Sequence, residues 1–203
     1  MPKRAVDWHS GDAYRIHKFE IEIEYVHNLK ELYKRLYFWL DDNGWKDLWD
    51  MNNYEVRYWQ RDLPAGLYEH HIWWRAWKTP GSMNHDNDFF KYFLKIDYQT
   101  IAGSRKEVMH KGKKWKLDKV NTILRVQSHL IVDWNKDDKG WDKGLLRSLK
   151  ANFRQWQYKD RIQQEEENLF NITVDFQNAI KNFVELATDK DQPPNIYPPN
   201  LLP

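Results

Sequence analysis

Adjacent histidines and paired aspartates are the residues of this chain whose types could support metal or acid–base chemistry. His70 and His71 are consecutive. Consecutive side chains of a strand point to opposite faces, so these two imidazoles cannot easily bind one metal ion. The aspartate pairs at 41–42 and 137–138 fall at a predicted helix end and in a predicted loop, where carboxylates are usually solvated. Gly-x-Ser-x-Gly and glycine-rich phosphate motifs are both missing from the sequence. We therefore expect no catalytic residue, no metal site, no cofactor and no enzymatic activity.

Lysines concentrate between residues 105 and 119, in a predicted hairpin that also contains one tryptophan. Basic side chains interleaved with an aromatic ring can neutralise phosphates and stack on a base, as contact with nucleic acid requires. A solvated hairpin whose lysines protect its edges against aggregation has the same composition. Since the net charge is only +2, we expect any nucleic-acid binding to be weak. The candidate residues are Lys111, Lys113, Lys114, Trp115 and Lys116.

The densest aromatic segment is the predicted strand 67–78, in a chain with 12 Trp, 11 Tyr and 9 Phe. Trp73 and Trp77 share one face of this strand and Trp74 lies on the other, so both faces are aromatic. A half-exposed antiparallel strand normally has one polar face. The second face is therefore covered either by another part of the chain or by a partner. The candidate interface residues are Trp59, Trp73, Trp74, Trp77 and Tyr197.

Composition limits the class of protein. Charged residues make up 31% of the chain with the two signs nearly balanced, unlike a binder driven by phosphate neutralisation. The absence of Cys excludes disulfides and thiolate chemistry and fits a reducing compartment. Residues 1–11 contain no apolar signal-peptide core, and no apolar run in the chain is long enough to span a membrane. We expect a cytoplasmic protein without a membrane span.

Apolar periodicity in the first half predicts a strand followed by a helix and then a hairpin. Strict alternation predicts the first strand over 18–25. Leucines at helical spacing follow, with Asn28 as the N-cap and Gly44 as the C-terminal stop. After a linker, strands over about 54–59 and 67–78 are joined by a turn.

The second half predicts more strands and then a long helix. We expect strands over 90–98 and 122–134, with a turn at Gly103-Ser104 and a short hairpin between them. Helical spacing runs from about Trp141 to Ala187, a length of about 70 Å at 1.5 Å per residue. The middle of this helix is charged, so it either bends near Asp160, is exposed to solvent, or is held by a partner.

The order of motifs in this half also resembles a known group of proteins. Gly112-Lys113-Lys114 precedes a strand that ends at 133–134, and Trp141 and a leucine pair then open the long charged helix. This order resembles an uncharacterised family of small archaeal proteins over residues 90–187. The resemblance implies a shared arrangement of these elements and an archaeal source, and nothing catalytic.

Together the elements predict an α+β fold, with an antiparallel meander sheet, one helix after the first strand and a long C-terminal helix. We expect a helix-grip-like arrangement, and a ferredoxin-like variant is the competing one. The expected units are a sheet with an inserted helix (1–140), the long helix packing on the sheet (141–188) and a Pro-rich tail (189–203). The expected core includes Phe19, Ile21, Ile23, Leu94, Ile96, Leu124, Val126 and Phe176.

Three functional hypotheses follow from these features. The first is a non-enzymatic structural protein that self-assembles into a homo-oligomer or filament, because two-sided aromatic strands, a long helix and a Pro-rich tail suit contacts between copies. The second is a module that binds a hydrophobic small molecule between the sheet and the terminal helix. The third is a nucleic-acid-associated protein that uses the basic hairpin.

Overall fold

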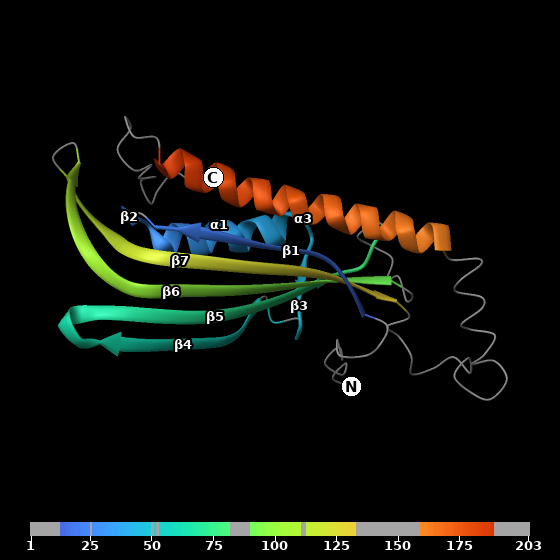
Figure 1. Cartoon of the computed structure of the whole chain (residues 1–203), viewed down its shortest axis with the longest axis horizontal. Coiled ribbons are helices and arrows are strands. Elements are labelled where there is room, and N and C mark those ends of the chain that lie inside the picture. The colour runs from blue at the N-terminus through green and yellow to red at the C-terminus, as the bar shows by residue number, and fades with distance from the viewer. Residues whose placement is uncertain are drawn as a thin grey trace.

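One antiparallel sheet and two helices make up the described part of the chain (Figure 1). The computed structural model describes residues 13–24, 26–49, 51, 53–81, 90–110, 113–132 and 159–188. In chain order, the elements are β1 (Ala13–Ile23), β2 (Val26–His27), α1 (Leu29–Asp42), β3 (Lys46–Asp47), β4 (Glu55–Leu63), the short helical turn η1 (Pro64–Gly66), β5 (Leu67–Lys78), β6 (Phe90–His110), β7 (Lys113–Val132) and α3 (Lys159–Thr188). The α+β class predicted from the sequence is confirmed.

The sheet follows the order β1-β7-β6-β5, with β3 and β4 both pairing with β5 and β2 pairing with β7. A meander is therefore present from β4 to β7. By contrast, β1 lies beside the last strand, at the opposite edge of the sheet from β4. Phe19 of β1 is opposite Val126 of β7, and Val126 is opposite Ile96 of β6. This register brings the apolar residues of distant strands onto one face.

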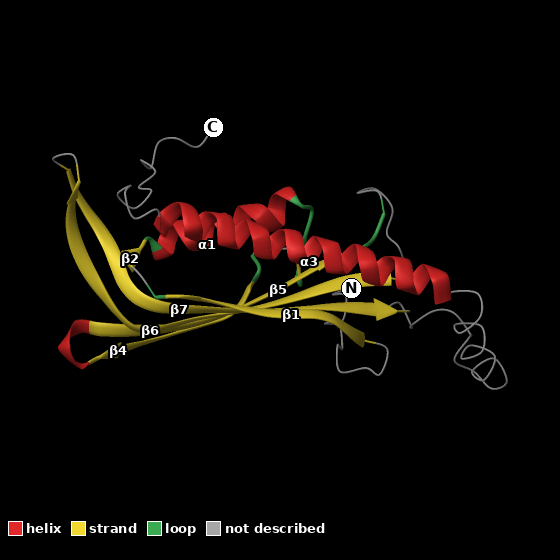
Figure 2. Cartoon of the chain, turned by 45° about the horizontal axis from the view of Figure 1, so that its top comes forward, coloured by secondary structure: helices red, strands yellow, loops and turns green. Residues whose placement is uncertain are grey.

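Both helices lie on the same face of the sheet, which we call the covered face (Figure 2). The other face, which we call the outer face, has no helix over it among the described residues. Along α3, Leu169, Phe176 and Ile180 are buried at helical spacing, and the helix contacts β1 and β7 of the sheet. The remainder of the predicted helix (141–158) and the tail (189–203) lie outside the described residues. All eight predicted core residues belong to this core or pack against it, seven of them buried and Ile21 partly buried.

The predicted limits of the first helix agree with the structure. The side chain of Asn28 accepts a hydrogen bond from the backbone N–H of Glu31 at 3.2 Å, which satisfies one of the unpaired donors at the helix start. At the other end, Gly44 has a φ of 70°, a conformation that favours glycine. The buried side chains of α1 are Leu32, Leu36 and Leu40.

The chain does not turn at Gly103-Ser104 as predicted. Instead β6 continues to His110, with a bulge in its pairing to β7 between Ile101 and Ser104. Ala102 takes a left-handed conformation there, with a φ of 52°. At Gly103, a Cβ atom would overlap the ring of Tyr68, so the glycine makes room for this aromatic side chain. Beyond this point the β6–β7 hairpin bends towards the side of the sheet that carries the helices (Figures 1 and 2).

The described residues of the predicted linker 45–53 surround a buried carboxylate. Asp47 is 4% exposed, and its Oδ2 accepts hydrogen bonds from the backbone N–H groups of Met51 (2.8 Å) and Asn53 (3.1 Å). The backbone carbonyl of Asp47 accepts a bond of 2.7 Å from the indole Nε1 of Trp77. These bonds hold β3 against β5 at the edge of the sheet.

The charged part of α3 is mostly exposed. The helix is continuous from Lys159 to Thr188, and most of its charged residues are exposed. The predicted bend near Asp160 falls at the limit of the described residues. Glu165 is the exception, since it is buried and accepts a hydrogen bond from the hydroxyl of Tyr92 on β6. No helix among the described residues has the length and apolar character needed to cross a membrane.

Candidate functional site on the outer face of β4 and β5

Tryptophan and arginine side chains gather on the outer face of β4 and β5. Alternation along β4 places Arg57, Trp59 and Arg61 on this face. Pairing with β5 sets Arg57 opposite Trp73 and Trp59 opposite His71. The strands thus bring residues from two segments of the chain into one surface.

Three of these rings form a continuous row, which we call the aromatic row: Trp59, His71 and Trp73. The centroids of Trp59 and His71 are 5.0 Å apart and their planes meet edge to face. The centroids of His71 and Trp73 are 5.8 Å apart with an interplanar angle of 23°, so these rings are stacked. Trp59 is 37% exposed, while the other two rings are partly buried. The row therefore offers ring surface to solvent.

Arginines flank the aromatic row. The guanidinium of Arg57 lies 5.3 Å from the ring centroid of Trp73, and that of Arg61 lies 5.6 Å from the ring centroid of Trp59. Arg61 also forms an ion pair of 2.8 Å with Glu69 on β5. These contacts hold both cations beside aromatic faces, within reach of a ligand that stacks there.

Trp77 is held by the protein at the far end of the same face. Its ring lies 3.8 Å from Nζ of Lys91 and 5.3 Å from Nζ of Lys46, and its indole N–H bonds to the carbonyl of Asp47. A side chain fixed in this way belongs to the architecture of the sheet edge. Trp59 and Trp73 are the predicted interface residues that present rings in the aromatic row.

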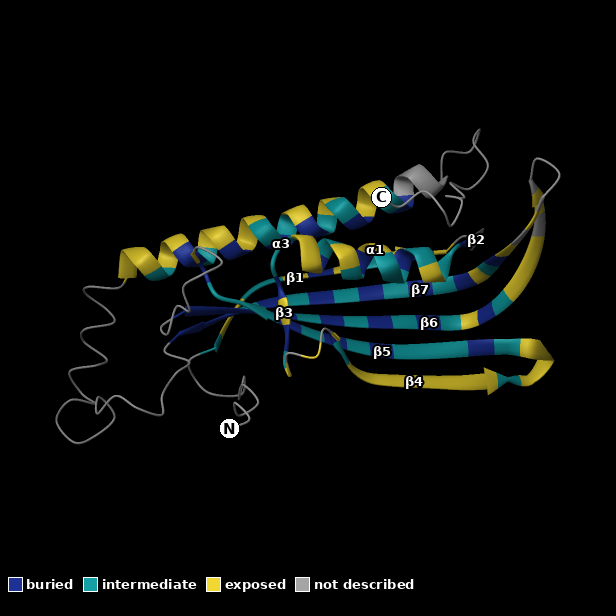
Figure 3. Cartoon of the chain, turned by 180° about the vertical axis from the view of Figure 1, so that it is seen from behind, coloured by how far each residue is buried: buried dark blue, intermediate teal, exposed yellow. Residues whose placement is uncertain are grey.

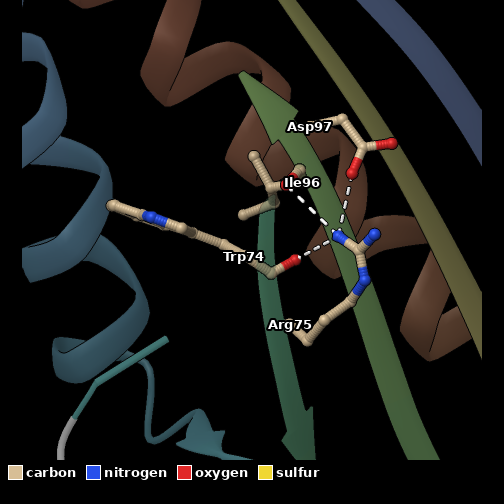
Figure 4. A network of polar contacts seen from close by, with 4 residues as sticks. All are labelled: Trp74, Arg75, Ile96 and Asp97. Atoms are coloured by element: carbon tan, nitrogen blue, oxygen red, sulfur yellow. Dashed lines mark hydrogen bonds and ion pairs between the residues drawn. The ribbon is translucent and has the colours of Figure 1, made fainter. Parts of the chain in front are cut away.

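Trp74 lies in the core of the protein, which corrects its predicted place at an interface. It is 3% exposed and points from the covered face towards α1 (Figure 4). Its ring meets that of Tyr33 edge to face at 4.6 Å and that of Tyr54 at 6.2 Å. The alternation of side chains along β5 puts Trp74 on the face that α1 covers. Of the two predicted alternatives for this face, cover by another part of the chain is therefore the correct one. Tyr197, the remaining candidate, lies outside the described residues.

A partly buried arginine links the aromatic strand to the next strand of the sheet. One Nη atom of Arg75 donates to the carbonyl oxygen of Trp74 (2.6 Å) and forms an ion pair with Asp97 (2.8 Å), as Figure 4 shows. The side chain of Arg75 is 12% exposed. The network therefore keeps a positive charge at the outer face without placing it at the surface.

Burial and neighbouring cations lower the pKa of two titratable groups on this face. The pKa of Lys95 is lowered, first by burial and then by the charge of Arg75. Burial, followed by the charges of Lys95, Arg15 and Arg75, lowers the pKa of His129 to about 4. Both shifts favour the less positive form, and burial is the larger cause in each case.

The basic hairpin is only partly described. Lys111 and the side chains of Lys113 and Trp115 lie outside the described residues. Lys114 is exposed, and its Nζ lies 3.7 Å from Oε2 of Glu107 in an ion pair. Lys116 is exposed as well. These two lysines sit on the bent arm beyond the end of β5, away from the aromatic row.

The two adjacent histidines lie on opposite faces, as predicted. His71 is in the aromatic row, whereas Nδ1 of His70 lies 3.1 Å from the hydroxyl of Thr100 near the covered face. Burial lowers the pKa of His70. Among the described residues, no group of three or more His, Asp or Glu side chains could hold a metal ion.

Tyrosine–carboxylate pairs are polar contacts that sequence reasoning missed. The hydroxyl of Tyr68 donates to Asp118 at 2.6 Å and that of Tyr33 donates to Glu55 at 2.9 Å. Burial, assisted by each carboxylate, raises the pKa of both tyrosines. Their hydroxyls therefore stay protonated and act as hydrogen-bond donors that join separate strands and helices. No local sequence signal connects residues as far apart as these.

The chain matches no family model, and no curated protein matches it. The resemblance to an archaeal family over residues 90–187 therefore stays a prediction.

Proposed function

We propose that this protein is a non-enzymatic structural protein that self-assembles, and that its copies join along the edge strand β4. The observation that carries this proposal is the exposure of β4. Among the described residues β4 pairs with β5 alone, and every residue from Val56 to Asp62 is exposed (Figure 3). An edge of this length presents a row of backbone donors and acceptors that another strand can pair with.

The composition of β4 supports pairing between copies. Proteins usually protect an edge strand with charged side chains, especially Lys, with Pro, or with a very short length. The nine residues of β4 include none of Lys, Pro or Gly, and two arginines balance one glutamate and one aspartate. Val56, Tyr58 and Trp59 favour extended backbone. High strand propensity together with low net charge is the composition of segments that pair between chains.

The symmetry of the contact would decide the kind of assembly. Pairing of β4 with β4 of a second copy gives a closed dimer. Pairing of β4 with the opposite edge strand β1 is a head-to-tail contact and gives a ring or an open filament. Both arrangements bury the same exposed edge, so both depend on β4.

Two further features belong to this proposal. We propose a helix-grip-like arrangement because α3 runs along the covered face of the sheet (Figure 2), and a cytoplasmic location because the chain has no Cys. A hydrophobic-ligand function has less support, because aromatic rings of the protein pack against one another on the covered face. Trp39 and Phe176, for example, join α1 to α3 with centroids 4.5 Å apart.

Size-exclusion chromatography with light scattering tests the proposal. The wild type should have a mass that is a multiple of the 24.9 kDa chain. Val56→Lys and Tyr58→Lys place charges on the edge at side chains that are 40% and 49% exposed, so the fold should survive while assembly is lost. Phe38→Lys is the matched control, since it adds the same charge at a 41% exposed ring of α1 and should leave assembly intact.

A monomeric wild type at every concentration would contradict self-assembly. Edge variants that assemble like the wild type would contradict the role of β4. Circular dichroism melting curves of the three variants check that each one is folded.

A further inference from the structure

We propose that the outer face of β4 and β5 binds single-stranded nucleic acid, with bases stacked on Trp59 and Trp73 and phosphates contacted by Arg57 and Arg61. This inference is independent of the self-assembly proposal, because it uses side chains of the sheet face, whereas assembly uses the backbone edge of β4. It also differs from binding through the basic hairpin 105–119.

The spacing of the rings suits a stacked strand. The aromatic row steps across two neighbouring strands with centroid separations of 5.0 and 5.8 Å. Exposed aromatic rings can accept any base, because every base has a π face, and an open antiparallel sheet presents such rings without a deep pocket. Unpaired bases can reach these rings, whereas the bases of a duplex are covered by their neighbours.

The charge of the face selects an anionic partner. On the outer face of β4, β5 and the part of β6 before its bulge, five cations oppose two carboxylates, which gives a net charge of +3 (five minus two) on a chain of net charge +2. Lys91 is buried and Arg75 is paired with Asp97, so Arg57 and Arg61 are the cations of this set that are exposed to a partner. The remainder of the chain is therefore net −1. The five cations are Arg57, Arg61, Arg75, Lys91 and Lys95, and the carboxylates are Glu69 and Asp97.

The same charge disfavours two other occupants of this face. A second copy that presented its own outer face would bring like charges together, which costs free energy. A neutral polysaccharide could stack on the rings but would gain nothing from the arginines. Rings and cations together fit a polymer that carries both flat bases and phosphates.

Fluorescence anisotropy with a labelled deoxythymidine oligonucleotide tests the inference. Trp59→Ala and Trp73→Ala should each raise the Kd by about 5- to 100-fold. Tyr58→Ala is the matched control: Tyr58 is 49% exposed and adjacent to Trp59, and its side chain lies on the opposite face of β4, so the Kd should change by less than about twofold. With two arginine contacts, log affinity should fall with log salt with a slope of about −1.4.

Several outcomes would overturn the inference. Among them are no binding at low salt, equal affinity for a duplex or a neutral polysaccharide, and equal effects of Tyr58→Ala and Trp59→Ala. If a tryptophan variant fails to fold, Arg57→Glu replaces it, because this exposed change removes a phosphate contact without altering the core. Unchanged affinity in Arg57→Glu would equally refute the proposed site. The monomeric edge variant Val56→Lys should still bind, which separates this result from the failure of self-assembly.

Discussion

Trp73 and Trp74 are consecutive in the chain and lie on opposite faces of the sheet. Trp74 is 3% exposed and packs edge to face on Tyr33 of α1. The ring of Trp73 lies on the outer face, beside the guanidinium of Arg57. One residue of alternation thus separates a core side chain from a surface one, and the two should respond differently to the same substitution.

Trp74→Ala should destabilise the protein by about 3–5 kcal/mol, because it removes a buried ring and leaves a cavity beneath α1. Trp73→Ala should cost about 1 kcal/mol or less, since its ring is only partly buried. Urea denaturation of both variants measures the two free energies of unfolding. Equal losses would show that the outer face is also a packed core.

The bulge in β6 predicts substitutions of opposite sign at neighbouring positions. Gly103→Ala should destabilise the protein by about 1–3 kcal/mol, because the new methyl group would overlap the Tyr68 ring. Ala102→Gly should instead be neutral or stabilise by up to about 1 kcal/mol, because glycine adopts a positive φ without strain. Melting temperatures of the two variants provide the comparison. If Gly103→Ala is harmless, the packing of Tyr68 over the bulge is wrong.

The hydrogen bond between Tyr68 and Asp118 should anchor the bent hairpin to β5. Tyr68→Phe and Asp118→Asn should each cost about 1–2 kcal/mol, and the double variant should cost less than their sum. The ultraviolet absorbance of tyrosinate gives a second measurement, since Asp118→Asn should lower the pKa of Tyr68. Strict additivity of the two substitutions would mean that the groups do not interact.

Local patterns were sufficient to predict much of this fold. Strict alternation over Phe19, Ile21 and Ile23 predicted β1, and the Asn28 cap and Gly44 stop predicted the limits of α1. Alternation along the predicted strand 67–78 also placed Trp73 and Trp74 on opposite faces of the sheet. Alternation alone could not predict which face of the sheet the helices cover, because that depends on contacts between residues far apart in the chain.

Two elements could not be predicted from local patterns. Gly103-Ser104 has the composition of a turn. In the structure, however, β6 stays paired with β7 on both sides of this point, and the extra residues form a bulge. At β3, Lys46 and Asp47 are too few to give a periodic signal, and their strand geometry depends on pairing with Trp77 and Ala76. The aromatic row likewise depends on the register of β4 with β5, which only the folded sheet specifies.

His129 should make stability fall in mild acid. Its pKa drops from an ordinary value of 6.5 to about 4 in the folded protein, so the unfolded chain binds the proton more tightly between these values. The stabilisation is fully present above pH 6.5 and is lost as the pH falls from 6.5 towards 4. We expect a loss of about 1–2 kcal/mol across this window, because partial exposure weakens the effect. His129→Gln should flatten this part of the stability profile, and an unchanged slope would exclude His129 as its source.

Amide hydrogen exchange along β4 tests the central proposal most directly. In a lone chain, the amides of residues 55–63 that point away from β5 should exchange at nearly the rate of solvent-exposed amides. Self-assembly through β4 predicts that these amides become protected as protein concentration rises, while the amides of β6, which has a strand on each side, stay protected throughout. If the outward amides of β4 remain unprotected at the highest concentration, copies of the protein do not join along this strand.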